Sequence, residues 1–181
     1  GKKELFKGLA IEKLEKDWYE YPVLHLDLNA ERYYNIGELT NLLQTYMRQW
    51  EEIYGAKEAN NSSLSQRFRA IIRSAKEKTG RNVVVLIDEY DKPILQAIGN
   101  EPLQQEFRDT LKAFYGVLKS ADADLKFALL TGVSKFGKVS VFSDLNNLKD
   151  ISMSSHNHDI CGITEKELHA TFDAAVGKLA Q

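Results

Sequence analysis

Cysteine is nearly absent from this 181-residue chain, whose only cysteine is Cys161. A single cysteine forms neither an intrachain disulfide nor a cysteine cluster for a metal, and we expect a cytoplasmic, reducing location on this ground. No apolar run reaches the length of a membrane span and no secretory signal opens the sequence, so no membrane partner is expected. Neither sign of charge dominates, because 24 Lys and Arg residues face 26 Asp and Glu residues. Basic side chains are spread along the chain rather than gathered in a block. The charge balance therefore gives no sign of a nucleic-acid partner, and whether the protein binds nucleic acid is unknown.

Internal repeats and long low-complexity linkers are also missing, and the length fits one domain that we expect to span residues 1–181. The composition, with 43% hydrophobic and 28% charged residues, is that of an ordinary globular protein. Apolar segments of two kinds alternate along it. Strands are predicted for 21–29, 83–88 and 125–132, and helices for 36–54, 63–79, 102–118 and 164–179. This alternation predicts an α/β fold with a parallel sheet.

Residues 83–87 are five consecutive apolar residues, and four of them are β-branched. This run predicts a strand that is buried on both faces. The earlier strand, 21–29, is expected to be mostly buried too, with His25 as a core histidine. Two helix starts carry capping boxes, one from Ser63 with Gln66 and one from Thr164 with Glu167. A short apolar pair, Ile160 and Ile163, precedes the second of them.

An acidic pair, Asp88 and Glu89, follows the 83–87 strand directly. Ligands of open α/β sheets bind at the carboxyl ends of the strands, and a strand followed by Asp-Glu is the Walker B pattern of nucleoside-triphosphate hydrolases. In that pattern the aspartate holds Mg²⁺, usually through water, and the glutamate polarises the attacking water. The alternative is a buried strand followed by a solvated acidic turn. Asp91 is either a third acidic ligand or, as we favour, a turn residue beside Lys92 and Pro93.

Polar residues also follow the 125–130 strand, where Thr131 and Ser134 are candidates to contact a γ-phosphate or the attacking water. Ordinary turn residues at a strand end are the alternative. The end of the first strand, at Asp27 and Asn29, is a weaker candidate for the same crevice.

Three further patterns are set aside. Residues 132–138 spell G-x-x-x-x-G-K, but Val139 stands where a P-loop needs Ser or Thr, and the sequence that follows does not predict a helix. The acid and lysine at residues 89–92 have the wrong spacing for a PD-(D/E)xK nuclease strand. His156 and His158 have a spacing that suits a metal, but no anchored ligand accompanies them, so a solvated loop is expected.

Several segments, taken in order, resemble one family: the AAA-ATPase-like proteins of Bacteroides-type bacteria, within the P-loop NTPase superfamily. The segments that carry the resemblance are 1–11, 21–29, 85–94, 130–136, 145–152 and 160–168. The resemblance implies a three-layer P-loop NTPase-like parallel sheet with flanking helices, with Asp88 and Glu89 in the Walker B position. It also implies a sensor region over residues 131–135, so that Lys135 is expected at the nucleotide along with Thr131 and Ser134. ATP and Mg²⁺ are the implied cofactors of the parent protein.

The phosphate-binding loop of that family has no counterpart in these residues, because the sequence contains no G-x-x-x-x-G-K-[ST]. We therefore expect an incomplete ATPase domain that is inactive alone and binds neither cofactor by itself. The family's usual strand order leaves a sheet edge exposed beside the Thr131 strand, deprives the Ile160 segment of its neighbour and makes self-association through that edge an expected interaction. The alternative function is a non-catalytic interaction module that keeps the ATPase fold.

Overall fold

The structure, a computed structural model, describes residues 2–57, 62–133, 145–157, 160 and 163–179. The chain forms two compact units, residues 1–146 and residues 147–181. Each unit is described by itself below.

The first unit contains a parallel three-stranded sheet in the order β1-β2-β3, formed by β1 (Val23–Asp27), β2 (Val83–Asp88) and β3 (Leu125–Leu130). Asp27 of β1 lies opposite Asp88 of β2, and Ile87 of β2 lies opposite Leu130 of β3. All three strands therefore end at the same edge of the sheet. The α/β class and the parallel sheet expected from the sequence are confirmed, and within the described residues β3 pairs with β2 alone.

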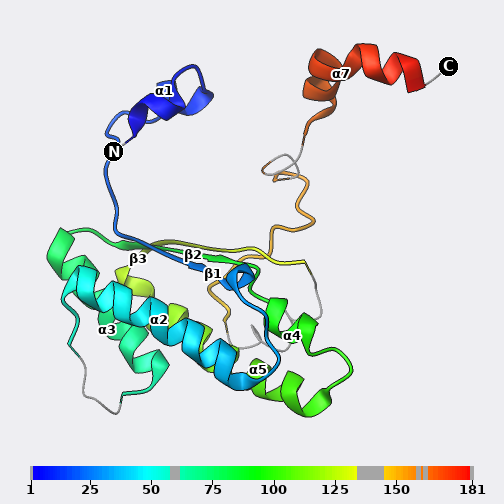
Figure 1. Ribbon diagram of the computed structural model, residues 1–181. Helices are drawn as coiled ribbons and strands as arrows, with labels where there is room; N and C mark the ends of the chain where they lie inside the picture. The colour runs from blue at the N-terminus through cyan, green and yellow to red at the C-terminus, as the bar shows by residue number, and fades with distance from the viewer. Residues whose placement is uncertain (1, 58–61, 134–144, 158–159, 161–162, 180–181) are drawn as a thin grey trace. The chain divides into compact units, whose positions relative to one another are not determined.

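Four helices that follow β1 lie on one side of the sheet (Figure 1). They are α2 (Ile36–Tyr54), α3 (Leu64–Thr79), α4 (Lys92–Gln96) and α5 (Glu101–Ser120), with 3-10 turns η2 (Leu28–Ala30) and η3 (Asp122–Asp124) between elements. The N-terminal segment forms η1 (Lys3–Phe6) and α1 (Ala10–Leu14). The predicted box at the start of α3 is present, since Ser63 Oγ accepts from the Gln66 amide while Gln66 Oε1 accepts from the Ser63 amide. The short helix α4 was not predicted; it forms because Pro93 occupies its first turn, where proline is tolerated.

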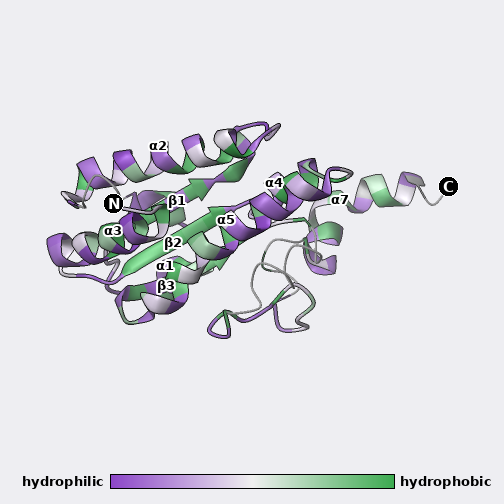
Figure 2. Cartoon of the chain, turned by 90° about the horizontal axis from the view of Figure 1, so that it is seen from below, coloured by the Kyte–Doolittle hydropathy of each residue, from purple (hydrophilic) through white to green (hydrophobic). Residues whose placement is uncertain are grey.

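The core between the sheet and these helices is built from stacked aromatic rings and aliphatic side chains. Phe68 of α3 and Phe114 of α5 stack with centroids 4.6 Å apart, and Trp50 of α2 stacks on Phe68 at 6.0 Å. The strands supply alternate residues to this core, namely Leu24, Leu26, Val83, Val85 and Ile87. In Figure 2 the strands are predominantly hydrophobic, and the helices beside them carry both hydrophobic and hydrophilic stripes.

The opposite face of the sheet is more exposed than the sequence predicts. Val23 is 45% exposed and Phe127 is 52% exposed, and Val84 and Leu86 between them are only half-buried. The prediction that the 83–87 strand is buried on both faces is therefore wrong. The first strand alternates between buried and open positions, and His25 lies on the exposed face rather than in the core. The reason is the one-sided packing of α2, α3 and α5.

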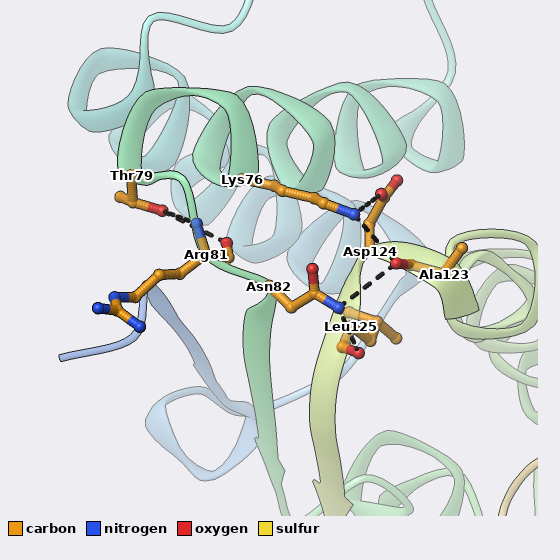
Figure 3. A network of polar contacts seen from close by, with 7 residues as sticks. All are labelled: Lys76, Thr79, Arg81, Asn82, Ala123, Asp124 and Leu125. Carbon is orange, nitrogen blue, oxygen red and sulfur yellow. Dashed lines mark hydrogen bonds and ion pairs between the residues drawn. The ribbon is translucent and has the colours of Figure 1, made fainter. Parts of the chain in front are cut away.

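A polar network holds the amino ends of β2 and β3 together (Figure 3). Lys76 Nζ contacts Asp124 Oδ1 at 2.8 Å and donates to the Ala123 carbonyl at 3.1 Å. The Asn82 amide donates to the carbonyls of Ala123 and Leu125 at 3.4 and 3.3 Å. These contacts join α3 and the residue before β2 to the turn that precedes β3.

The second unit contains α7 (Glu165–Leu179). The predicted capping box at its start is confirmed, because Thr164 Oγ1 accepts from the Glu167 amide and Glu167 Oε2 accepts from the Thr164 amide. Ile160 and Ile163 are both exposed, and Ile160 lies in a bend. Across both units, no described helix is long and apolar enough to cross a membrane.

Candidate functional site

Asp88 and Thr131 meet at the carboxyl edge of the sheet. Asp88 is the last residue of β2, and Thr131 directly follows β3. The Thr131 hydroxyl donates to Asp88 Oδ1, and the Glu89 amide donates to the same oxygen at 3.1 Å. The Asp88 side chain remains exposed to solvent while it makes these bonds. Two residues that lie 43 positions apart in the sequence are thus combined into one carboxylate-hydroxyl pair.

Glu89 has an unusual backbone conformation for a residue with a Cβ. Its φ is +53°, in the left-handed region, which raises the energy of residues other than glycine. The strand ends at Asp88, so Glu89 belongs to the turn rather than to the pleat, and its side chain is half-buried. Backbone strain of this kind is concentrated at functional sites in proteins. Because of this backbone conformation, the direction of the Glu89 side chain does not follow from the alternation of side chains along β2.

The turns after β2 and β3 are joined by a ladder of hydrogen bonds. The Thr131 amide donates to the Ile87 carbonyl at 2.9 Å, and the Tyr90 amide donates to the Thr131 carbonyl at 2.9 Å. Further along, the Val133 amide donates to Asp91 Oδ1 at 3.2 Å. The pairing of the two strands is therefore continued beyond their ends.

Asp91 is fully buried, and in the described part of the chain no other charged residue is buried. Its backbone occupies the turn position before α4, as the favoured sequence interpretation holds, but its side chain points into the protein. Because Asp91 has no solvent exposure, its carboxylate is not available as a third ligand for a solvated ion. Its role was missed because only the fold brings it to Val133. The glycine after Thr131 was the available signal, since Gly132 is where the two turns approach closely.

The end of β1 lies beside the same edge. Asp27 is in register with Asp88, its side chain accepts from the Asn29 amide at 2.7 Å, and Lys92 Nζ donates to the Asn29 side chain and carbonyl. An open pocket of about 480 Å³ lies next to this contact. Its lining is polar: Asn29, Ala30, Glu31, Arg32, Tyr34, Glu38, Lys92 and Gln96. The weaker candidates Asp27 and Asn29 thus share an edge with Asp88.

Two buried tyrosines support this edge from beneath. The Tyr115 hydroxyl donates to the Tyr90 carbonyl at 3.1 Å, and the Tyr33 hydroxyl donates to the Leu28 carbonyl at 2.7 Å. Burial raises the pKa of both phenols above the ordinary value, with Asp91 a further cause at Tyr115 and Glu31 at Tyr33. Each hydroxyl therefore stays protonated and able to donate at neutral pH.

Several candidate residues lie outside the described part of the chain, namely Ser134, Lys135, His158 and most of the G-x-x-x-x-G-K segment. His156 is described and is exposed. Within the described residues, no group of three or more His, Cys, Asp or Glu side chains is arranged to hold a metal ion. A metal at this edge would therefore rely on few protein ligands.

The donor set at the edge fits Mg²⁺, which binds oxygen atoms and retains several waters around one or two carboxylates. Asp88 offers an exposed carboxylate, and the Thr131 hydroxyl lies within hydrogen-bonding range of it. Glu89 provides a second carboxylate one residue away, in a different environment. This pattern can bind a hydrated cation and can orient a water molecule.

A family model described as a predicted AAA-ATPase, of the AAA-ATPase-like family, matches residues 1–142. An uncharacterised protein encoded in the vnfD 5′ region of Azotobacter chroococcum mcd 1 is 39% identical over 173 residues. That alignment covers 95% of this chain and 33% of the relative, so the chain spans about a third of the relative's length. No solved structure matches. Because the family model covers most of the sequence, the chain belongs to the AAA-ATPase-like family.

Proposed function

We propose that the carboxyl edge of the sheet is the metal- and water-binding half of a Mg²⁺-nucleotide site, and that the parent protein hydrolyses ATP. The observation that carries this proposal is the contact between Thr131 and Asp88, which places a hydroxyl and an exposed carboxylate together at the ends of adjacent parallel strands. Membership of the AAA-ATPase-like family supports the choice of ATP.

Each residue has a separate role in this proposal. Asp88 would hold Mg²⁺ through water, and the bound metal would supply positive charge against the phosphates. Glu89 accepts a hydrogen bond from the attacking water and activates it as a general base. Thr131 stays beside Asp88 and turns its hydroxyl so that it donates to the terminal phosphate. The roles of Ser134 and Lys135, next to Thr131 in sequence, are to contact the same phosphate.

In this proposal the phosphate-binding half of the site comes from outside these 181 residues, among which no G-x-x-x-x-G-K-[ST] occurs. Such a loop supplies most of the backbone amides that hold the phosphates. We therefore propose that the chain alone does not bind Mg²⁺-ATP in the micromolar range and that a protein carrying the loop does.

The missing loop also favours a second candidate, in which the chain is a non-catalytic interaction module with an ATPase fold. In that case the acidic pair has no substrate to act on. The two candidates differ in whether a protein that contains both this chain and the phosphate-binding loop needs Asp88 to bind Mg²⁺-ATP.

Titration calorimetry with Mg²⁺-ATP separates them. In a full-length protein that contains this chain, we expect micromolar binding that Asp88→Ala weakens at least tenfold, while removal of Mg²⁺ abolishes the difference. Asp109→Ala is the matched control, since it removes an exposed carboxylate from α5, outside the edge. Equal affinity in the Asp88→Ala and wild-type proteins would favour the interaction module. Micromolar binding to the 181-residue chain alone, lost in Asp88→Ala, would contradict the proposal that the chain is inert by itself.

A further inference from the structure

The contact between Asp91 and the Gly132-Val133 segment brings a fully buried carboxylate to the proposed site without exposing it to a ligand. A buried carboxylate is costly unless polar partners compensate its loss of water. The Val133 amide is one such partner, at 3.2 Å from Asp91 Oδ1. The side chain of Asp91 thus bonds to backbone two residues beyond Thr131.

Gly132 allows the close approach that this bond requires. A Cβ added at Gly132 would lie 2.6 Å from Asp91 Oδ1 and 2.6 Å from Tyr90 Cε1. Distances this short are inside van der Waals contact, so any other residue would force the Asp91 carboxylate, the Tyr90 ring or the turn after β3 to shift. The position requires glycine because of space.

The contact lies in a chain of bonds that runs from α5 to Thr131. The Tyr115 hydroxyl holds the Tyr90 carbonyl, and the Tyr90 amide holds the Thr131 carbonyl. Asp91 then accepts from the Val133 amide of the same turn. Thr131 is therefore bracketed on both sides by the segment that directly follows Asp88 and Glu89.

We propose that Asp91 is a positioning residue, which with Gly132 locks the turn after β3 against the turn after β2 and so keeps the Thr131 hydroxyl at Asp88. The lock itself is a property of the fold, and its effect on catalysis rests on the proposed function. Asp91 touches neither nucleotide nor metal. It acts by keeping the hydroxyl and carboxylate of the site in one place.

The lock is tested by amide hydrogen exchange, which does not depend on nucleotide. In the wild-type protein we expect the Val133 amide to be protected at least a hundredfold. In Asp91→Ala its exchange should accelerate at least tenfold more than that of the Val84 amide, which bonds to the Pro22 carbonyl at the other end of β2. Asp91→Asn should stay within threefold of wild type, because an amide oxygen accepts the same bond. Gly132→Ala should behave like Asp91→Ala.

Val83→Ala is the control for general loosening, since it truncates a buried side chain at the far end of β2 and should accelerate Val84 more than Val133. An unprotected Val133 amide in the wild type, or an equal acceleration of both amides in Asp91→Ala, would overturn the lock.

Steady-state hydrolysis by the full-length protein tests the catalytic part. We expect Asp91→Ala to lower kcat at least tenfold with KM for Mg²⁺-ATP within threefold, and Asp91→Asn to restore kcat. An unchanged kcat in Asp91→Ala, with hydrolysis present in the wild type, would overturn the positioning role. If the wild type does not hydrolyse ATP, the proposed function fails, while the exchange data still decide whether the lock exists.

Discussion

Glu89 has a carboxylate side chain and a backbone conformation that glycine adopts more readily. Its φ of +53° follows directly on the last residue of β2, and the hydrogen bonds of Tyr90 and Lys92 continue the turn after it. The strained conformation is therefore maintained by its neighbours. Replacing Glu89 should separate the stability of this turn from its chemistry.

The first prediction compares two variants that lack the same carboxylate. Glu89→Gly should unfold with a free energy about 1 kcal/mol higher than Glu89→Ala, because only alanine keeps the Cβ that disfavours a positive φ. Denaturant unfolding of both variants measures this difference. At an ordinary strand or helix position alanine is the more stable of the two by about 0.5–1 kcal/mol. A result of that sign would show that Glu89 is not strained.

The buried phenols give a second prediction at the residue scale, for alkaline pH. The pKa of Tyr33 and of Tyr115 is raised by burial in the folded protein from an ordinary value near 10. The folded state then holds protons that the unfolded state releases, so stability is complete below pH about 10 and falls as pH rises beyond it. Urea unfolding between pH 8 and 11 should show this decline.

Tyr115→Phe is the informative variant for this effect. It loses the bond to the Tyr90 carbonyl and should be less stable by about 1 kcal/mol at pH 8, yet its stability should fall less steeply above pH 10. Tyr19→Phe serves as control, because Tyr19 is 52% exposed. An identical alkaline decline in wild type and Tyr115→Phe would contradict the assignment.

At the scale of single elements, helix starts were predictable because their signals are local. Ser63 with Gln66 and Thr164 with Glu167 lie within one turn of sequence, and both capping boxes form as expected. The strands were also found, since short segments rich in apolar residues define them without reference to partners. The helix α4 was missed because Pro93 reads as a turn unless its place in a first helical turn is known.

A third prediction concerns the cap of α3. Ser63→Ala should lower the free energy of unfolding by about 1 kcal/mol, because the Gln66 amide loses its acceptor and the reciprocal geometry is disturbed. Ser74→Ala, in the middle of the same helix, should leave stability unchanged or slightly raise it. Thermal or urea unfolding of the pair checks this, and equal effects in the two variants would count against the cap.

What the sequence could not predict at this scale depends on contacts between elements. His25 and the outer face of β2 appeared buried because an apolar strand does not record whether helices cover one face or two. Asp91 appeared to be a surface turn residue because its contact with Val133 depends on how β2 and β3 align. The position of Thr131 at the same sheet edge as Asp88, by contrast, follows from strand order, since parallel neighbours end at one edge, but the hydrogen bond between the two was not predicted.

At the scale of the whole molecule, the family match covers residues 1–142, while the alignment with the Azotobacter relative covers 95% of the chain. The family model thus matches most of the sheet unit. Its outer face and the β3 strand carry exposed apolar side chains, among them Phe127 and Leu129. Exposed strands with such side chains promote association between copies.

The fourth prediction is that this surface drives self-association of the chain. Phe127→Lys should shift sedimentation toward the monomer at high protein concentration, with little change in stability because the ring is 52% exposed. Ile98→Lys is the matched control: it replaces a 70% exposed apolar residue that lies after α4 rather than on the sheet. Association that is reduced equally by both substitutions would show that the sheet is not the contact surface.

The role of the edge as half of a nucleotide site is tested most directly by ATP hydrolysis in the full-length protein with Glu89→Gln. The substitution keeps the size of the side chain and removes its ability to act as a base. We predict that the variant still binds Mg²⁺-ATP within threefold of the wild-type affinity while its kcat falls by about 10²–10⁴-fold, the usual contribution of a positioned general base. Hydrolysis at the wild-type rate by Glu89→Gln, or a wild-type protein that does not hydrolyse ATP, would contradict the account.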